Sequence, residues 1–192
     1  SYLHFWPIHL DTHRRRNNKT GELTYPDYPK TSTLKNITIS NVVLRTAGRI
    51  ILTAEDGCKI KNVRLNGIQM TYPWIEDPEM VQDISDRMQG SNYSPEARAA
   101  SAAVVAKNVD NLQLSDLTIE WPDGDVPDDF LAIYEKGEVV IDPKTSNRPL
   151  PKFHVFWGKN IKGGLLDIPL ATASDAGTEE LVLKDSEIIQ KA

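Results

Sequence analysis

Several residue types and patterns are scarce in this chain of 192 residues, and each scarcity excludes a class of protein. The single cysteine, Cys58, excludes an internal disulfide framework and a zinc site built from cysteines. No apolar run reaches the roughly 18–20 residues that a helix needs to cross a bilayer, so we expect no membrane partner. The net charge is −5, whereas a general nucleic-acid surface needs a concentrated positive field, so we expect no nucleic-acid partner either.

The start of the chain, SYLHFWPIHL, has neither a methionine nor the basic-then-apolar pattern of a secretory signal. This predicts a processed chain or a piece of a longer one. With 40% hydrophobic residues, the 192 residues are enough to bury one sizeable core, so we expect a single domain.

What the sequence does contain is a recurring phrase of ten residues. A polar pair is followed by alternating apolar residues, a small or polar turn residue, and a second alternating stretch. The copies are KNITISNVVL (35–44), KNVRLNGIQM (61–70), DNLQLSDLTI (110–119), KNIKGGLLDI (159–168) and EELVLKDSEI (179–188). Their first apolar residues, Ile37, Val63, Leu112, Ile161 and Leu181, are separated by 26, 49, 49 and 20 residues. Such steps indicate stacked rungs of a solenoid.

The periodicity inside each phrase predicts strands. Apolar residues alternate, as in Ile37 and Ile39, and the next residue (Asn41, Gly67, Asp116 or Gly164) is of a type that tolerates left-handed backbone angles. A further apolar stretch precedes several phrases, at 48–53, 102–107 and 153–158. About three short strands per turn, with nothing helical recurring, predict an all-β chain: a parallel β-helix of about six to eight turns and about 25 residues per turn, to which the family resemblance described below assigns the right hand.

Three segments depart from the repeat. Residues 71–101 have helical character, with Asp77 and Ser94 as caps just before prolines, and 121–152 are rich in proline and acids. Both are interpreted as insertions between rungs. Residues 1–33 form a cap, an insertion or an irregular first rung, so the domain is predicted as 1–192, the C-terminal part of a longer solenoid.

LKNITISNVVL (34–44) and IKNVRLNGIQM (60–70), with a strand between them and an insertion after them, resemble the pectin-lyase-like right-handed β-helices. The resemblance spans about residues 34–190 and is strongest to the C-terminal part of the polygalacturonase-like enzymes of glycoside hydrolase family 28. It implies a secreted or periplasmic enzyme that hydrolyses acidic, uronate-containing polysaccharides with two carboxylates and without a cofactor or metal.

That family carries Asn-Thr-Asp, Asp-Asp, Gly-His-Gly and Arg-x-Lys motifs on successive rungs. Only Asp128-Asp129, in PDDFLAIYEKG, resembles one of them here, and LQLSDLTIEW (112–121) on the preceding rung offers only Asp116 at a turn. The resemblance therefore makes Asp128 and Asp129 the catalytic candidates, with a solvated acidic loop as the alternative interpretation. It implies the C-terminal part of an enzyme, or a relative that lost or moved its site.

The densest group of chemically active residues lies near the start. In an extended segment, His9, Asp11 and His13 project from one face. Together with neighbouring arginines and aromatics they suit contact with an acidic glycan; a divalent metal site, or simple docking of the segment on the core, are the alternatives. The substrate-binding candidates are His4, Trp6, His9, Asp11, His13, Arg14 and Arg15, with Arg16 completing the basic run.

Other polar groups have structural interpretations. Glu55-Asp56-Gly57 predicts a turn, His154 and Cys58 are expected to be structural, and a calcium site among the acids around Trp121 is disfavoured by their spacing. The asparagines at equivalent positions (Asn36, Asn62, Asn111 and Asn160) are predicted to stack and hydrogen-bond along the solenoid.

Three functions remain open from the sequence. The first is part of a glycoside hydrolase acting on acidic polysaccharide or oligosaccharide. The second is a non-catalytic β-helix that binds glycans or assembles with an N-terminal β-helix portion or a second chain. The third is a polysaccharide lyase, which needs calcium and a basic residue near the scissile uronate.

Overall fold

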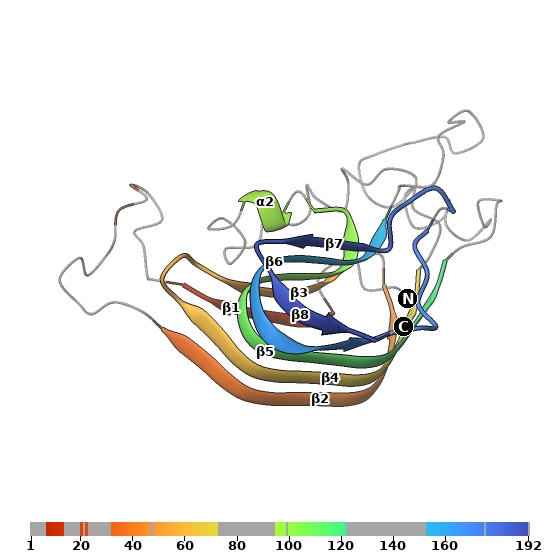
Figure 1. The fold of residues 1–192 in the computed structure, drawn as a ribbon, viewed down its shortest axis with the longest axis horizontal. Helices are drawn as coiled ribbons and strands as arrows, with labels where there is room; N and C mark the ends of the chain where they lie inside the picture. Colours follow the sequence, from red (N-terminus) through yellow and green to blue (C-terminus); the bar gives the residue numbers. More distant parts are fainter. Residues whose placement is uncertain are drawn as a thin grey trace, which may run out of the picture.

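The structure is a computed structural model that describes residues 7–13, 20, 22, 32–46, 48–72, 95–98, 100–121, 153–174 and 176–191. These residues are almost entirely β (Figure 1). The strands are β1 (His9–Thr12), β2 (Thr33–Arg45), β3 (Ile50–Ala54), β4 (Lys59–Thr71), β5 (Ala102–Glu120), β6 (His154–Asp167), β7 (Leu181–Lys184) and β8 (Glu187–Gln190). One short helix, α2 (Pro95–Arg98), precedes β5. Within the described residues, no helix is long and apolar enough to cross a membrane.

The strands stack as five rungs in the described residues. The first rung is β1 with β2, the second β3 with β4, the third β5, the fourth β6 and the fifth β7 with β8. Every pairing between neighbouring rungs is parallel. The long strands curve around a common interior, so the sheet is nearly closed (Figure 1). This arrangement is the one expected of an all-β parallel solenoid.

The register confirms the first part of the predicted repeat and corrects the second. Ile37 pairs with Val63, and Val63 with Leu112, as predicted. Leu112, however, pairs with Gly164, and Ile161 pairs instead with Val109. The fifth phrase is also out of register, because Leu181 pairs with Phe156.

Hydrogen-bonded positions on adjacent rungs are therefore 26, 49, 52 and 25 residues apart. The physical reason is that β5 bends at Asn108 as well as at Asn111, and both have positive φ. The fourth phrase therefore aligns with the bend at Asn108, whereas the sequence repeat aligned it with the bend at Asn111.

The bends that were expected between short strands occur inside long ones. At each bend a residue takes a left-handed backbone angle that most residue types avoid. The predicted turn residues Asn41, Gly67, Asp116 and Gly164 have φ of 57°, 64°, 51° and 113°. Because asparagine, aspartate and glycine tolerate these angles, the pairing continues around the corner.

The asparagine stack is confirmed for three of its four predicted members. Asn62 Nδ2 donates to Asn36 Oδ1 (2.9 Å), and Asn111 Nδ2 donates to Asn62 Oδ1 (3.0 Å). Asn160 belongs to a different stack, because its Nδ2 donates to Asn108 Oδ1 (2.6 Å). Each of these four asparagines and Asn108 has a positive φ, so the same residue supplies both the bend and the hydrogen bond.

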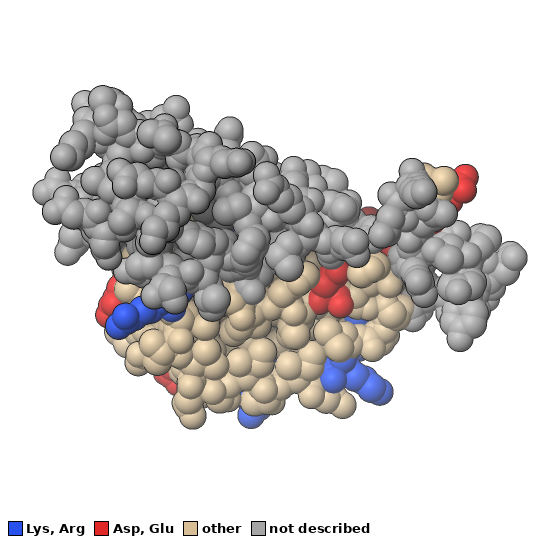
Figure 2. Space-filling model, turned by 180° about the vertical axis from the view of Figure 1, so that it is seen from behind, with Lys and Arg blue, Asp and Glu red and all other residues tan. Residues whose placement is uncertain are grey.

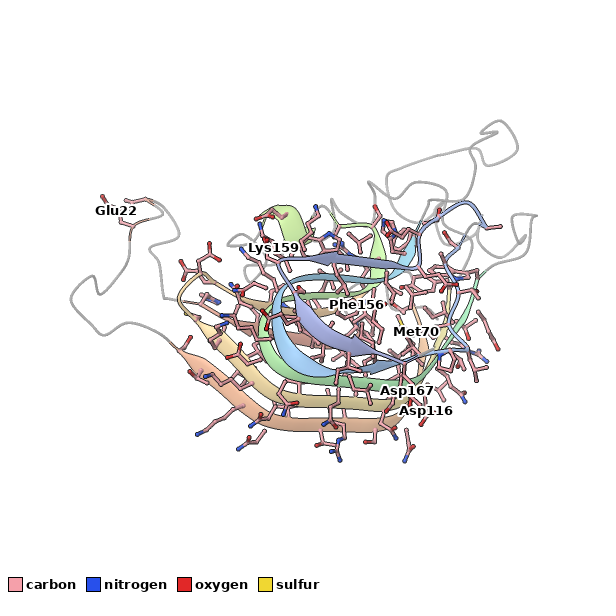
Figure 3. All side chains as sticks on the ribbon, in the orientation of Figure 1. Glu22, Met70, Asp116, Phe156, Lys159 and Asp167 are labelled. Atoms are coloured by element: carbon pink, nitrogen blue, oxygen red, sulfur yellow. The ribbon has the colours of Figure 1, made fainter. Side chains whose placement is uncertain are left out.

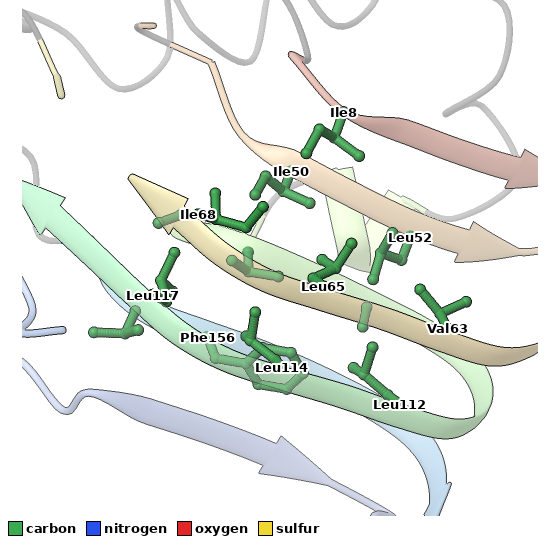
Figure 4. Packing of buried hydrophobic residues seen from close by; sticks show 14 of the residues in the cluster. Ile8, Ile50, Leu52, Val63, Leu65, Ile68, Leu112, Leu114, Leu117 and Phe156 are labelled. Atoms are coloured by element: carbon green, nitrogen blue, oxygen red, sulfur yellow. The ribbon is translucent and has the colours of Figure 1, made fainter. Parts of the chain in front are cut away.

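The core is formed by inward residues of the middle rungs (Figure 4). Leu65, Leu114 and Phe156 are completely buried and come from three successive rungs. Burying a side chain of this size contributes roughly 1.5–3 kcal/mol, so such core residues provide much of the stabilisation. Phe156 packs beside Gly158, where an added Cβ would lie 2.6 Å from its ring.

Several smaller predictions are also confirmed. Residues 56 and 57 form a turn between β3 and β4, with Gly57 at φ 89°. A helix begins at Pro95, as expected after Ser94. Cys58 is buried in the core, and His154 Nδ1 contacts the carbonyl oxygen of Glu179. The segment 1–33, left open by the sequence, contains β1. Asp77 and most of the two predicted insertions lie outside the described residues.

Candidate functional site

A column of polar side chains follows the outer face of the sheet formed by β1, β3, β5, β6 and β7. Its members are paired in register from strand to strand, and their neighbours along each strand face the core. We call this column the outer strip, and it consists of Asp11, Thr53, Lys107, Lys159 and Lys184. Figure 3 shows the alternation in β6, where Phe156 lies in the interior and Lys159 lies near α2.

The three lysines of the outer strip differ in exposure and partner. Lys107 is almost buried, with 6% of its side chain exposed, and it forms an ion pair with Asp56 at 3.0 Å. Lys159 forms an ion pair with Glu96 of α2 at 2.5 Å. Lys184 is exposed, and its Nζ lies 5.7 Å from the centre of the Trp157 ring. Lys159 and Lys184 are thus the accessible cations.

The pKa values reflect these pairings. The hydrogen bond from Asn108, and then the one from Lys107, lowers the pKa of Asp56. The hydrogen bond between Lys159 and Glu96 lowers the pKa of Glu96 and raises that of Lys159. Asp56, Glu96 and Lys159 are therefore charged at neutral pH, so fixed charges of both signs lie along the outer strip.

The predicted N-terminal cluster falls at the beginning of the outer strip. His13 Nδ1 lies 2.9 Å from Asp11 Oδ2, and the hydroxyl of Thr53 donates to Asp11 Oδ1 at 3.4 Å. Burial raises the pKa of Asp11, partly offset by its bond to His13, and burial lowers the pKa of His9. Asp11 therefore orients one imidazole and one hydroxyl at the end of the lysine column.

The described residues contain no group of three or more histidine, cysteine, aspartate or glutamate side chains arranged to hold a metal ion. The remaining predicted site residues lie outside the described residues. They are His4, Trp6, Arg14, Arg15 and Arg16 of the N-terminal group, and the catalytic candidates Asp128 and Asp129.

An apolar column lies beside the outer strip on the same face. Ile51, Val105 and Trp157 occupy matching positions on β3, β5 and β6, and they pack with Ala97 of α2. The short helix thus covers apolar surface and places Glu96 next to Lys159. The sequence analysis missed the strip lysines. A sequence signal could have found them, because Lys107, Lys159 and Lys184 each directly precede an asparagine or aspartate, and that residue has a positive φ in the structure.

The described charges are not gathered into a patch of one sign on the opposite view of the molecule (Figure 2). That face is mostly uncharged where it is described, and the few acidic and basic side chains on it are scattered. The column of Lys107, Lys159 and Lys184 is instead defined by the register of β5, β6 and β7.

No family model, no curated protein and no solved structure matches this chain. Its class is thus given by its own fold, a parallel all-β stack of rungs, and its candidate site by the outer strip.

Proposed function

We propose that this chain is a right-handed parallel β-helix whose outer strip contacts an acidic, uronate-containing polysaccharide, as part of a polygalacturonase-like glycoside hydrolase. The parallel pairing of rungs about 25 residues apart supports the β-helix. Crossover connections between parallel strands of one sheet are right-handed in about 98% of cases, which supports the hand.

The observation that carries the glycan proposal is the lysine column of β5, β6 and β7. Lys107, Lys159 and Lys184 are aligned in register on adjacent strands. Neighbouring strands are about 4.7–4.9 Å apart, so positive charge recurs at short, regular intervals along the stack. A polyuronate carries carboxylates at regular intervals too, so a chain lying along the stack meets both accessible cations, Lys159 and Lys184, at once.

The ion pair between Lys159 and Glu96 does not block this contact. Both side chains are partly exposed, at 28% and 47%. An exposed ion pair contributes little to stability, so a glycan carboxylate can replace Glu96 at little cost. Lys107, which is almost buried, is held by the exposed Asp56 and serves as a fixed background charge.

The hydrolase part of the proposal rests on the sequence resemblance. Inverting hydrolysis needs an acid and a base about 6.5–9.5 Å apart. The candidates for this pair, Asp128 and Asp129, follow the third rung in sequence. A non-catalytic glycan-binding β-helix is the second candidate, favoured by the observation that the carboxylates beside the strip, Asp56 and Glu96, are engaged by lysines.

One assay separates these functions. The protein is incubated with polygalacturonate and, as a control, with a neutral polysaccharide of similar length. New reducing ends without ultraviolet absorbance indicate hydrolysis, and new ends with absorbance indicate the double bond of a lyase product. Binding detected by calorimetry without new ends indicates the non-catalytic candidate. The absence of both binding and cleavage overturns the proposal.

Charge-removal variants then locate the contact. We expect Lys184→Gln and Lys159→Gln each to weaken polyuronate binding several-fold. Lys191→Gln removes the same charge from an exposed lysine that pairs with Asp167, away from the outer strip, and is expected to bind normally. Equal loss in all three variants would show that net charge, not the strip, governs binding.

A further inference from the structure

The two ends of the stack bury their core residues less completely than its middle. Inward residues of the middle rungs, such as Leu65 and Leu114, have no exposed surface. In the end rungs, Ile39 of β2, which pairs with Leu65, and Leu183 of β7 are only partly buried. Each end of the stack is therefore a partly open apolar face.

The end strands also have an open side in the described structure. There β1 pairs only with β3 and β2 only with β4, while β7 and β8 pair only with β6. A strand edge of this kind presents unpaired backbone groups that favour addition of another strand. β2 is 13 residues long, so the edge is extensive.

The two ends of the stack carry charges of opposite sign within one column, so the charges of the two ends are complementary. One outward column runs through all five rungs with the members Lys35, Lys61, Asp110, Lys162 and Glu187. It begins with a cation on β2 and ends with an anion on β8. Both terminal residues are exposed.

The outer strip has the opposite polarity. It begins with Asp11 on β1 and ends with Lys184 on β7. If the fifth rung of one copy lies on the first rung of another and continues the register, Glu187 meets Lys35 and Lys184 meets Asp11. One translation along the stack satisfies both pairs and places Leu183 over Leu10.

We propose that copies of this chain associate head to tail, with the β7–β8 end of one copy stacked on the β1–β2 end of the next. The contact adds parallel strand pairing, covers the partly exposed core residues of both ends and pairs the terminal charges of two columns. The two surfaces are different, so the contact is heterologous and each added copy leaves a new free end. The product is an open-ended series of oligomers rather than a closed dimer.

Sedimentation velocity of the 192-residue chain, whose monomer mass is 21.5 kDa, tests the proposal over a wide concentration range. We expect the average mass to increase with concentration beyond that of a dimer. We also expect weaker association at about 1 M salt, where screening shortens the range of charge interactions to about 3 Å. A monomer at every concentration, or a mass that stops at the dimer, overturns the proposal.

Charge exchange identifies the surfaces. Lys35→Glu alone places two acids opposite each other, and Glu187→Lys alone places two lysines opposite each other, so each is expected to weaken association about tenfold. Combining both substitutions in one chain restores opposite charges and is expected to recover association. An equimolar mixture of the two single variants is also expected to associate, because each then meets a complementary end.

Circular dichroism of all variants provides the control for folding, which we expect to be unchanged because both residues are exposed. If the chain associates but neither single substitution weakens it, the contact lies elsewhere and the proposal is wrong. The same conclusion follows if the combined variant associates no better than the single variants.

Discussion

Asn111 donates its side-chain amide to Oδ1 of Asn62 at 3.0 Å, although 49 residues of sequence separate them. Both residues have positive φ, 57° and 53°. Each asparagine thus bends its own strand and bonds the bend of the rung beside it. Asn62 does so in both directions, because it also donates to Asn36.

Asn62→Ala is expected to destabilise the protein through both roles. A left-handed angle costs a residue with Cβ roughly 1–2 kcal/mol, and the lost hydrogen bonds contribute about 0.5–1.5 kcal/mol each. Asn62→Gly loses the same bonds but tolerates the angle, so we expect it to be less destabilising than alanine. Urea unfolding of the three proteins measures the difference. Equal stability of the glycine and alanine variants would show that backbone conformation contributes little.

Gly164→Ala is expected to be among the most damaging small substitutions. A Cβ at this position would lie 2.6 Å from Leu112 N and closer still to the carbonyl oxygen, and φ is 113°. Backbone atoms of a central strand cannot move aside, so we expect a loss of roughly 3 kcal/mol or more. The adjacent Gly163 is the matched control. It has φ 73° but nothing within 4 Å of an added Cβ, so Gly163→Ala is expected to cost only about 1–2 kcal/mol. The thermal stabilities of the two variants separate the cost of overlap with the Leu112 backbone from the cost of the left-handed backbone angle.

Arg49→Met is expected to leave stability unchanged or to raise it by about 1–3 kcal/mol. Arg49 is 1% exposed, and its Nε and Nη2 are buried without a hydrogen-bond partner in the described structure. Its Nη1 donates to the carbonyl oxygen of Ala100, which also accepts from Ala102 N. The substitution therefore removes a buried charge without leaving that oxygen unsatisfied. A clear loss of stability in urea at neutral pH would indicate that the guanidinium makes a necessary contact.

The stability difference between the wild type and Arg49→Met is also expected to depend on pH, in a direction that the pKa of Arg49 sets. Burial lowers the pKa of Arg49 to about 10 from 12.5. Between these values the unfolded chain binds this proton more readily than the folded one, so the stability of the wild type rises with pH across that range. Below a pH of about 10, Arg49 is charged in the folded protein, so the cost of burying its charge is fully present. We therefore expect the stability difference between Arg49→Met and wild type to shrink as the pH is raised above about 10.

His9 predicts acid sensitivity near neutral pH. Burial lowers its pKa below 6.5 despite the nearby Asp11. Below pH 6.5 the unfolded chain takes up this proton first, so stability falls as the pH drops toward the lowered pKa. Asp11 acts oppositely and over a more acidic range, because burial raises its pKa above 3.8 and favours the protonated folded state. We expect the stability of His9→Gln to decrease less steeply below pH 6.5 than that of the wild type, as measured by unfolding between pH 7 and 5. An unchanged slope would remove His9 as its origin.

Sequence patterns alone predict much of this fold because each rung is encoded locally. Alternation of apolar residues gives the strands, and asparagine, aspartate or glycine gives the bends, so the register from Ile37 to Leu112 follows directly. The error after Leu112 has an equally local origin. Asn108 and Asn111 offer two bend positions three residues apart, and the sequence does not show that Asn160 selects the first.

The candidate site is less predictable because it is assembled across rungs. Asp11 and His13 are close in sequence, and their contact is consistent with the expected grouping. Lys107, Lys159 and Lys184 are far apart in sequence, and only the true register aligns them. The misaligned repeat places Lys159 opposite Asp110, so the lysine column is invisible until β6 is moved by three residues.

The layered arrangement has a consequence for how the protein unfolds. Among the described strands, each rung pairs only with the rung before it and the rung after it, so β2 does not pair with β6. Stability in such a chain is a sum of terms for each unit and for each boundary between units, and loss of order propagates from the outside inward. Hydrogen exchange should accordingly proceed as a gradient, fastest in β1, β2, β7 and β8 and slowest in β5, the central unit on which cooperativity depends.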